Sequence, residues 1–299
     1  MSPPLRRRIT FLLASVVVAT LGVIGFFAAT AWRPVHEVVL SSERRPSDLI
    51  LSNDSYASLI DTHARPYVFN SQRGPGQVLV YGAEHVRDPA DPRCAEIERA
   101  WNEFHPTVAL VESRLGIMFP QLMDPVRTFG EPGLVHALAR RDGVPTYTWE
   151  PPVATLVKSV LDQGFTREQV ALRMHLGSYF SNLRHGRPKD PEAFVRDTFA
   201  RRNRWPGIED AFASIADLDA AWKREFPGGP DWRDVSDEFG LPGFLARMDL
   251  NLARDQHLVA VVNELTARHQ RVFVIAGSSH AVKVHPALQP SSDGGSGID

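Results

Sequence analysis

Four short runs of apolar and β-branched residues constrain this chain more than any other feature. The runs are residues 78–81, 108–111, 144–149 and 272–276. Amphipathic helical stretches separate the first three. Strands that read as continuous apolar runs are buried on both faces, and helices between such strands give a mainly parallel sheet. The sequence therefore predicts an α/β fold, with a mainly parallel sheet flanked by helices.

The middle of the chain breaks this alternation. Residues 151–240 show helical patterns only, including a capping box formed by Thr166 and Gln169. A last helix, predicted at 244–268, leads into the final strand. We therefore expect an all-helical insertion at 151–240 inside an α/β domain that covers residues 77–290.

The N-terminal end carries the longest apolar segment. Three arginines at 6–8 precede 23 uncharged residues at 9–31, and about 20 are enough to cross a bilayer. The arginines stay in the cytoplasm, so the rest of the chain is exported. Residues 1–32 are either a signal anchor or a signal peptide cleaved after Ala31, where the tripeptide Ala-Thr-Ala ends. We expect a membrane-anchored, extracytoplasmic protein that contacts the membrane through this N-terminal helix; a cleaved form, secreted or periplasmic, is the alternative.

Two segments border the predicted domain. Residues 33–76 are rich in polar residues and proline, with short apolar runs, and are interpreted as a juxtamembrane lead-in. The folded domain is expected to begin near Gln77. Residues 291–299 have too little apolar content to fold and are predicted to be a disordered tail.

Composition excludes several classes of protein. The formal net charge is −2, and no basic stripe is present, which argues against a nucleic-acid partner bound through its phosphates. The single cysteine, Cys94, excludes an intrachain disulfide and a cysteine-rich zinc site. No Gly-x-Ser-x-Gly elbow is present, which argues against a serine hydrolase.

A polar residue follows the C-terminal end of each predicted strand. In chain order these residues are His85, Glu112, Glu150 and His280. The carboxyl ends of parallel strands meet at one edge of a sheet, where ligands bind. Taken singly, each residue has an ordinary alternative as a capping or solvated group. Together, they predict a site at this edge.

Both histidines belong to a Gly-x-x-His sequence that begins at a strand exit. Gly82 and Gly277 fit positions that need a positive φ or a close backbone approach. A third copy, from Gly133 to His136, falls inside a predicted helix. His136 is therefore predicted to be structural.

Two histidines with one or two carboxylates are a ligand set that suits a first-row divalent metal with one position open for water. We expect His85 and His280 to be metal ligands and Glu112 to be a third ligand or a general base. Metal-activated water and a glutamate that accepts its proton are the elements of metal-assisted hydrolysis. Glu150 is a further catalytic candidate.

Arg254 is the cationic candidate. It lies part-way along the predicted helix 244–268, where the apolar face of that helix begins. Its functional interpretation is a bidentate donor to a carboxylate or a developing oxyanion; the alternative is a solvated charge or a partner for a neighbouring carboxylate. We expect its guanidinium to lie within about 6 Å of Glu112 or Glu150.

These residues lie in stretches that resemble the TraB/GumN family, which includes the Tiki proteins and is more distantly similar to the erythromycin esterases and the haem-binding ChaN proteins. The stretches are VYGAEHV, PTVALVESR, VPTYTWE and VIAGSSHAV, together with Arg254 near a helix start. The resemblance covers about residues 77–290. It departs at Asp255, where the family often has asparagine, and at TWEPP, a loose version of the usual Leu-Glu-Thr.

The resemblance implies a site for a divalent metal ion (Mn, Co or Zn) and a metallopeptidase activity of the kind attributed to the Tiki branch. Together with the residues, it predicts a metal-dependent hydrolase, peptidase-like, that acts on a peptide or small-molecule substrate. One alternative is a non-catalytic binder of haem, iron or a peptide, of the ChaN type. The other is a metal-free esterase resembling erythromycin esterase, with a histidine as general base.

Overall fold

The computed structural model describes residues 3–41, 47–183, 186–235 and 243–290, and side chains from residue 15 onward. The predicted disordered tail, 291–299, lies outside the described residues. The chain divides into two compact units. Unit 1 comprises Met1–Ser41, Thr62–Trp149 and Val262–Asp299, and unit 2 comprises Ser42–Asp61 and Glu150–Val261.

Unit 1 contains the sheet. Its strands are β1 (His36–Glu37), β2 (Tyr67–Arg73), β3 (Gly76–Ala83), β4 (Val108–Val111), β5 (Thr146–Thr148) and β6 (Arg271–Gly277). The helices within it are α1 (Pro3–Thr30), α3 (Pro92–Phe104), α4 (Pro125–Phe129), α5 (Glu131–Asp142) and α12 (Ser278–Leu288).

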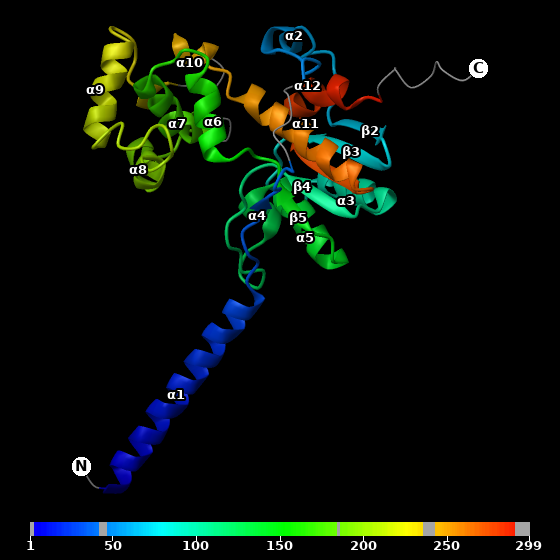
Figure 1. The fold of residues 1–299 in the computed structure, drawn as a ribbon. Helices are drawn as coiled ribbons and strands as arrows, with labels where there is room; N and C mark the ends of the chain where they lie inside the picture. The colour runs from blue at the N-terminus through cyan, green and yellow to red at the C-terminus, as the bar shows by residue number, and fades with distance from the viewer. Residues whose placement is uncertain (1–2, 42–46, 184–185, 236–242, 291–299) are drawn as a thin grey trace. The chain divides into compact units, whose positions relative to one another are not determined.

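The strands form one sheet in the order β1-β5-β4-β6-β3-β2. Figure 1 labels β2, β3, β4 and β5 of this sheet. All neighbouring strands are parallel except β2 and β3, which are antiparallel. The predicted mainly parallel sheet is therefore confirmed. The last strand in sequence, β6, lies between β3 and β4, so the carboxyl ends of these three strands meet at one edge.

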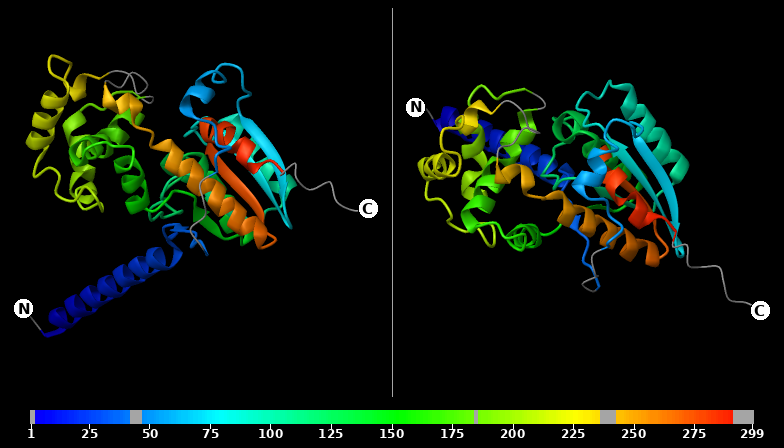
Figure 2. Two further views of the ribbon diagram at one scale, coloured as in Figure 1. Left: turned by 45° about the horizontal axis from the view of Figure 1, so that its top comes forward. Right: turned by 90° about the horizontal axis from the view of Figure 1, so that it is seen from above.

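Side chains on both faces of the sheet are buried, as the continuous apolar runs predict. On one face Tyr81, Ala109 and Phe273 pack with α3 and α5 in a shared core. On the other face lies α12, whose Ser278 Oγ donates to the carbonyl of Gly82 at 3.0 Å. Figure 2 shows α12 alongside β2 and β3. Helices thus flank the sheet.

The prediction that residues 33–76 are only a lead-in is wrong, because this segment supplies β1 and β2. β2 forms an antiparallel hairpin with β3, so the folded domain begins before Gln77. Only Phe69 and Ser71 of β2 are buried. An edge strand with so few buried positions reads as a loop in sequence.

Helix α1 is a continuous helix of 28 residues. Among its residues from 15 onward, seven large apolar side chains are exposed: Val16, Val17, Val18, Leu21, Val23, Ile24 and Phe26. Within the part of the chain whose side chains are described, no helix has both the length and the apolar character needed to cross a bilayer. The membrane anchor stays a prediction.

Unit 2 is helical over its described residues. It contains α2 (Asn53–Ala57), α6 (Val153–Leu161), α7 (Arg167–Asn182), α8 (Pro191–Arg202), α9 (Ile215–Glu225), the 3-10 helix η2 (Trp232–Asp234) and α10 (Phe244–Arg247). The described residues between 151 and 240 hold no strand, as predicted. The predicted capping box of Thr166 and Gln169 begins α7.

The predicted helix 244–268 is divided into α10 and α11 (Asn251–Ala267). The division arises at Asp249, whose Oδ1 accepts the backbone N–H groups of Asn251 and Leu252, each at 2.9 Å. Such a cap satisfies the first donors of a new helix. Arg254 therefore lies in the first turn of α11 rather than part-way along a longer helix. α11 carries the chain from unit 2 into unit 1.

Candidate functional site

The carboxyl ends of β3, β4 and β6 bring three predicted residues together in unit 1. Glu112 Oε2 accepts the backbone N–H of Gly277 at 2.6 Å, and Glu112 Oε1 lies 3.9 Å from His280 Nε2. A Cβ placed on Gly277 would lie 3.1 Å from His85 Nε2 and 3.6 Å from Glu112 Oε2. His85 and Glu112 therefore lie beside Gly277, and His280 lies beside Glu112.

Close approach, rather than an unusual φ, explains both glycines of the Gly-x-x-His sequences. Gly277 has a φ of −62°, and its missing side chain leaves room for the His85 ring. A Cβ on Gly82 would lie 2.7 Å from the Cβ of Ala281 and 2.8 Å from the Tyr67 carbonyl oxygen. Larger residues at either position would displace the elements that form this edge.

His85 itself has the unusual backbone, with a φ of 65°. A side chain in this left-handed region costs roughly 1–2 kcal/mol. The next residue is held by Glu131, whose Oε1 accepts the Val86 N–H at 2.5 Å. Strained backbone supported by its surroundings is frequent at functional sites.

Glu131 is the residue of this site that the sequence did not reveal. It is the first residue of α5 and is 2% exposed. Burial raises the pKa of its carboxyl group, and the nearby Glu112 charge adds to this, whereas the Val86 N–H and His85 oppose it. An acidic residue before a proline at a helix start is explained by the helix dipole alone, so no sequence signal separated Glu131 from an ordinary first-turn glutamate.

His280 is fixed by the first turn of α12. It is 4% exposed, and its ring lies edge-on to Trp149 with a centroid separation of 5.2 Å. The Trp149 indole N–H donates to the Ile275 carbonyl at 3.0 Å, which holds that ring against β6. The imidazole is thus placed by a rigid aromatic neighbour.

His136 lies inside α5 and is buried, in agreement with its predicted structural role. Its ring lies edge-on to Trp32, with centroids 5.2 Å apart. Burial, assisted by the charge of Arg140, lowers the pKa of His136 to about 4. The ring is therefore neutral near pH 7.

The other two predicted residues form a pair in unit 2. Arg254 donates from Nε to Glu150 Oε2 at 2.9 Å and from Nη2 to Glu150 Oε1 at 2.6 Å. Its Nη1 donates to Asn251 Oδ1 at 3.1 Å. The expected contact between Arg254 and Glu150 is confirmed, and it is equally the contact that the alternative of a partner for a neighbouring carboxylate predicts. A solvated Arg254 is wrong, because its side chain is only 18% exposed. A catalytic role for the pair stays a prediction.

The unit 1 residues suit a divalent metal by type. The 3.9 Å between His280 Nε2 and Glu112 Oε1 is within the roughly 4 Å that two ligands of one ion can span, given bonds of about 2 Å. However, no three His, Cys, Asp or Glu side chains in the described ranges are grouped closely enough to hold an ion. Glu112 and His280 are thus close enough to bind one ion, and the full ligand set of His85, Glu112 and His280 stays a prediction.

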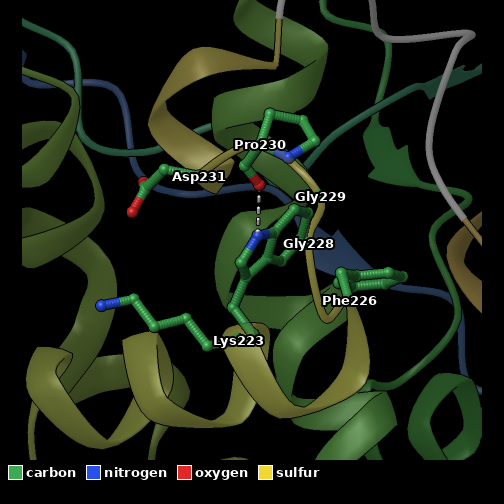
Figure 3. Close-up of a pocket in the computed structure, with 7 residues that line it drawn as sticks. Lys223, Phe226, Gly228, Gly229, Pro230 and Asp231 are labelled. Carbon is green, nitrogen blue, oxygen red and sulfur yellow. Dashed lines mark hydrogen bonds between the residues drawn. The ribbon is translucent and has the colours of Figure 1, made fainter.

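A small cavity of about 110 Å³ lies in unit 2 and contains none of the predicted residues (Figure 3). The lining residues are Trp222, Lys223, Phe226, Gly228, Gly229, Pro230 and Asp231. The Trp222 indole N–H donates to the Pro230 carbonyl at 2.9 Å. The cavity is formed by the end of α9 and the turn that follows it.

No protein family, curated protein or solved structure matches this chain. The resemblance to the TraB/GumN family therefore rests on the quoted sequence stretches.

Proposed function

We propose that this protein is a metal-dependent hydrolase whose centre is formed by His85, Glu112 and His280. The observation that carries the proposal is that His85 and Glu112 lie beside Gly277 and His280 lies beside Glu112, although the three residues follow three different strands. His85 and His280 would hold a Mn, Co or Zn ion together with Glu112. When bound, such an ion supplies Lewis-acid polarisation of a carbonyl and makes water a stronger acid.

Glu112 has two distinct oxygens in this proposal. Oε2 is held by the Gly277 N–H, which fixes the carboxylate. Oε1 lies 3.9 Å from His280 Nε2 and would either bind the ion or act as the general base for water. Glu131 holds the loop of His85 through Val86.

Arg254 is proposed to bind a substrate carboxylate or a developing oxyanion. Its guanidinium would supply the positive charge for such a group. Glu150 already holds two of the guanidinium nitrogens, so its part in this proposal is to orient Arg254. The proposed substrate is a peptide or a small molecule with a hydrolysable carbonyl.

We further propose that the protein is anchored in the membrane by residues 9–31, with the α/β domain on the extracytoplasmic side. The uncharged length of this segment, the arginines before it and the exposed apolar side chains of α1 support an anchor.

Hydrolysis of peptide and ester libraries by the purified full chain, before and after exhaustive chelation, tests the proposed function. We expect turnover that chelation abolishes and that Mn, Co or Zn restores. Turnover that survives chelation would favour the metal-free esterase. A Soret band on haem titration, without turnover of either library, would favour the ChaN-type binder.

A further inference from the structure

An uncharged surface loop follows β4. Residues 115–123, with the sequence LGIMFPQLM, contain no charged residue. Ile117 is 54% exposed and Leu122 is 70% exposed, although Leu115 and Met118 of the same loop are buried. The loop is thus anchored to the core by two side chains and presents two others outward.

This loop is joined directly to the end of the N-terminal apolar segment. Trp32, the first residue after that segment, donates its N–H to the Met118 carbonyl at 2.8 Å and accepts the Met118 N–H at 3.3 Å. The Phe27 and Phe119 rings lie edge-to-face, with centroids 6.1 Å apart. Contacts from α1 and from Trp32 therefore hold the loop.

We propose that loop 115–123 contacts the lipid bilayer and inserts Ile117 and Leu122 at its surface. The inference rests on the proposed membrane anchor. Tryptophan is enriched where a membrane-spanning helix leaves the bilayer. A loop paired with Trp32 then lies at the same depth, and exposed apolar side chains at that depth are stabilised by lipid.

The apolar surface of α1 continues into loop 115–123, which indicates that lipid covers the exposed side chains of the loop. The apolar surface of α1 runs through Phe26, which is exposed, to Phe27 and from there to Phe119. A bilayer that surrounds α1 reaches the loop without a gap, so Ile117 and Leu122 need no separate protein partner.

The contact has a consequence for the substrate of the proposed hydrolase. Only Ser113 and Arg114 separate Glu112 from the loop in sequence. The catalytic carboxylate is therefore held close to the membrane surface, and substrates attached to or lying on the membrane are favoured over freely dissolved ones.

Fluorescence quenching tests the loop contact. The variants Ile117→Cys and Leu122→Cys, made in the full chain, are labelled with an environment-sensitive fluorophore and reconstituted into phosphatidylcholine vesicles with or without nitroxide-labelled lipid. Val68→Cys is the matched control, because Val68 is an apolar side chain of β2 that is 45% exposed. The unchanged chain, whose single cysteine is buried, is the labelling blank.

We expect the nitroxide lipid to quench the labels at 117 and 122 at least about twofold, with little effect at 68. Equal quenching at all three positions in chains that float with the vesicles would overturn the inference. Chains that do not float with the vesicles would overturn it together with the anchor. The readout uses no turnover, so a failure of the proposed hydrolase activity would leave this result unchanged.

Discussion

Glu112 and Glu150 occupy equivalent places in the sequence pattern, each soon after a strand, but their surroundings differ. Glu112 is held by a backbone N–H from β6 at one oxygen and turns the other toward His280. Glu150 has both oxygens bound by Arg254. Glu112 is thus oriented by the backbone of β6, whereas both oxygens of Glu150 bind one guanidinium group. The comparison favours Glu112 as the residue that performs the proposed chemistry and Glu150 as the residue that orients Arg254.

Removing the charges of Glu112 and Glu150 one at a time tests this difference most strongly. Glu112→Gln removes a ligand or base, and we expect kcat/KM to fall by about 10²–10⁴-fold. Glu150→Gln leaves one oxygen to accept from Arg254, so its loss should be much smaller. Steady-state kinetics of both variants, with circular dichroism to verify folding, checks the difference. Equal losses would remove the distinction between the two glutamates.

The next largest effect is expected for Arg254→Lys. Lysine keeps the positive charge but loses the planar fork, so turnover should fall by about 10²-fold while the bound metal is retained. Arg141 is a matched control, because it also contacts carboxylates, those of Glu98 and Asp142, but is about half-exposed. Arg141→Lys should leave turnover unchanged. Loss of metal in Arg254→Lys would instead connect the arginine to the metal ligands.

Each unit also contains a buried histidine with a lowered pKa, and each of these histidines should make the protein less stable in acid. Burial lowers the pKa of His136 in unit 1 and of His175 in unit 2 to about 4, with help from Arg140 and Arg202 respectively. The unfolded chain takes up a proton near pH 6.5 and the folded chain only near pH 4, so the free energy of unfolding decreases as the pH falls through this window. At pH 5 each histidine should lower it by about 2 kcal/mol.

Urea unfolding between pH 7 and pH 5 measures this decrease. Substitution of His175 by Phe should flatten the pH dependence of the helical unit, since Phe199 and Phe212 already surround the ring. An unchanged pH dependence in that variant would show that His175 does not cause it.

A smaller effect is expected for Glu131, which acts through His85. Glu131→Gln keeps the acceptor for the Val86 N–H but removes the charge beside His85, and we expect kcat to fall by about tenfold with little change in KM. Glu131→Ala should lose more, because Val86 N–H then has no acceptor. Rescue by Gln relative to Ala, together with a shifted pH profile, would support a positioning role. Identical kinetics for Gln and Ala would contradict it.

The strand-end residues were predictable because a parallel sheet places the carboxyl ends of its strands at one edge. Four continuous apolar runs were enough to locate His85, Glu112 and His280 there. β2 was not predictable, since its burial depends on packing against β3 and α12. The start of α11 was missed because Asp249 reads as an ordinary helix residue until its cap is seen. Glu131 was missed because its partner, the N–H of Val86, lies far away in the sequence. The residues next to Glu131 do not reveal this contact.

Cobalt titration of the full chain tests the central claim most directly. Co²⁺ held by two imidazoles and a carboxylate gives visible absorption that depends on its ligands. We predict one binding event per chain in the wild type, lost in both His85→Ala and His280→Ala and retained in His36→Ala, which alters an exposed histidine of β1. Identical titrations of the wild type and the His85 and His280 variants, or no cobalt uptake by any of them, would contradict the account.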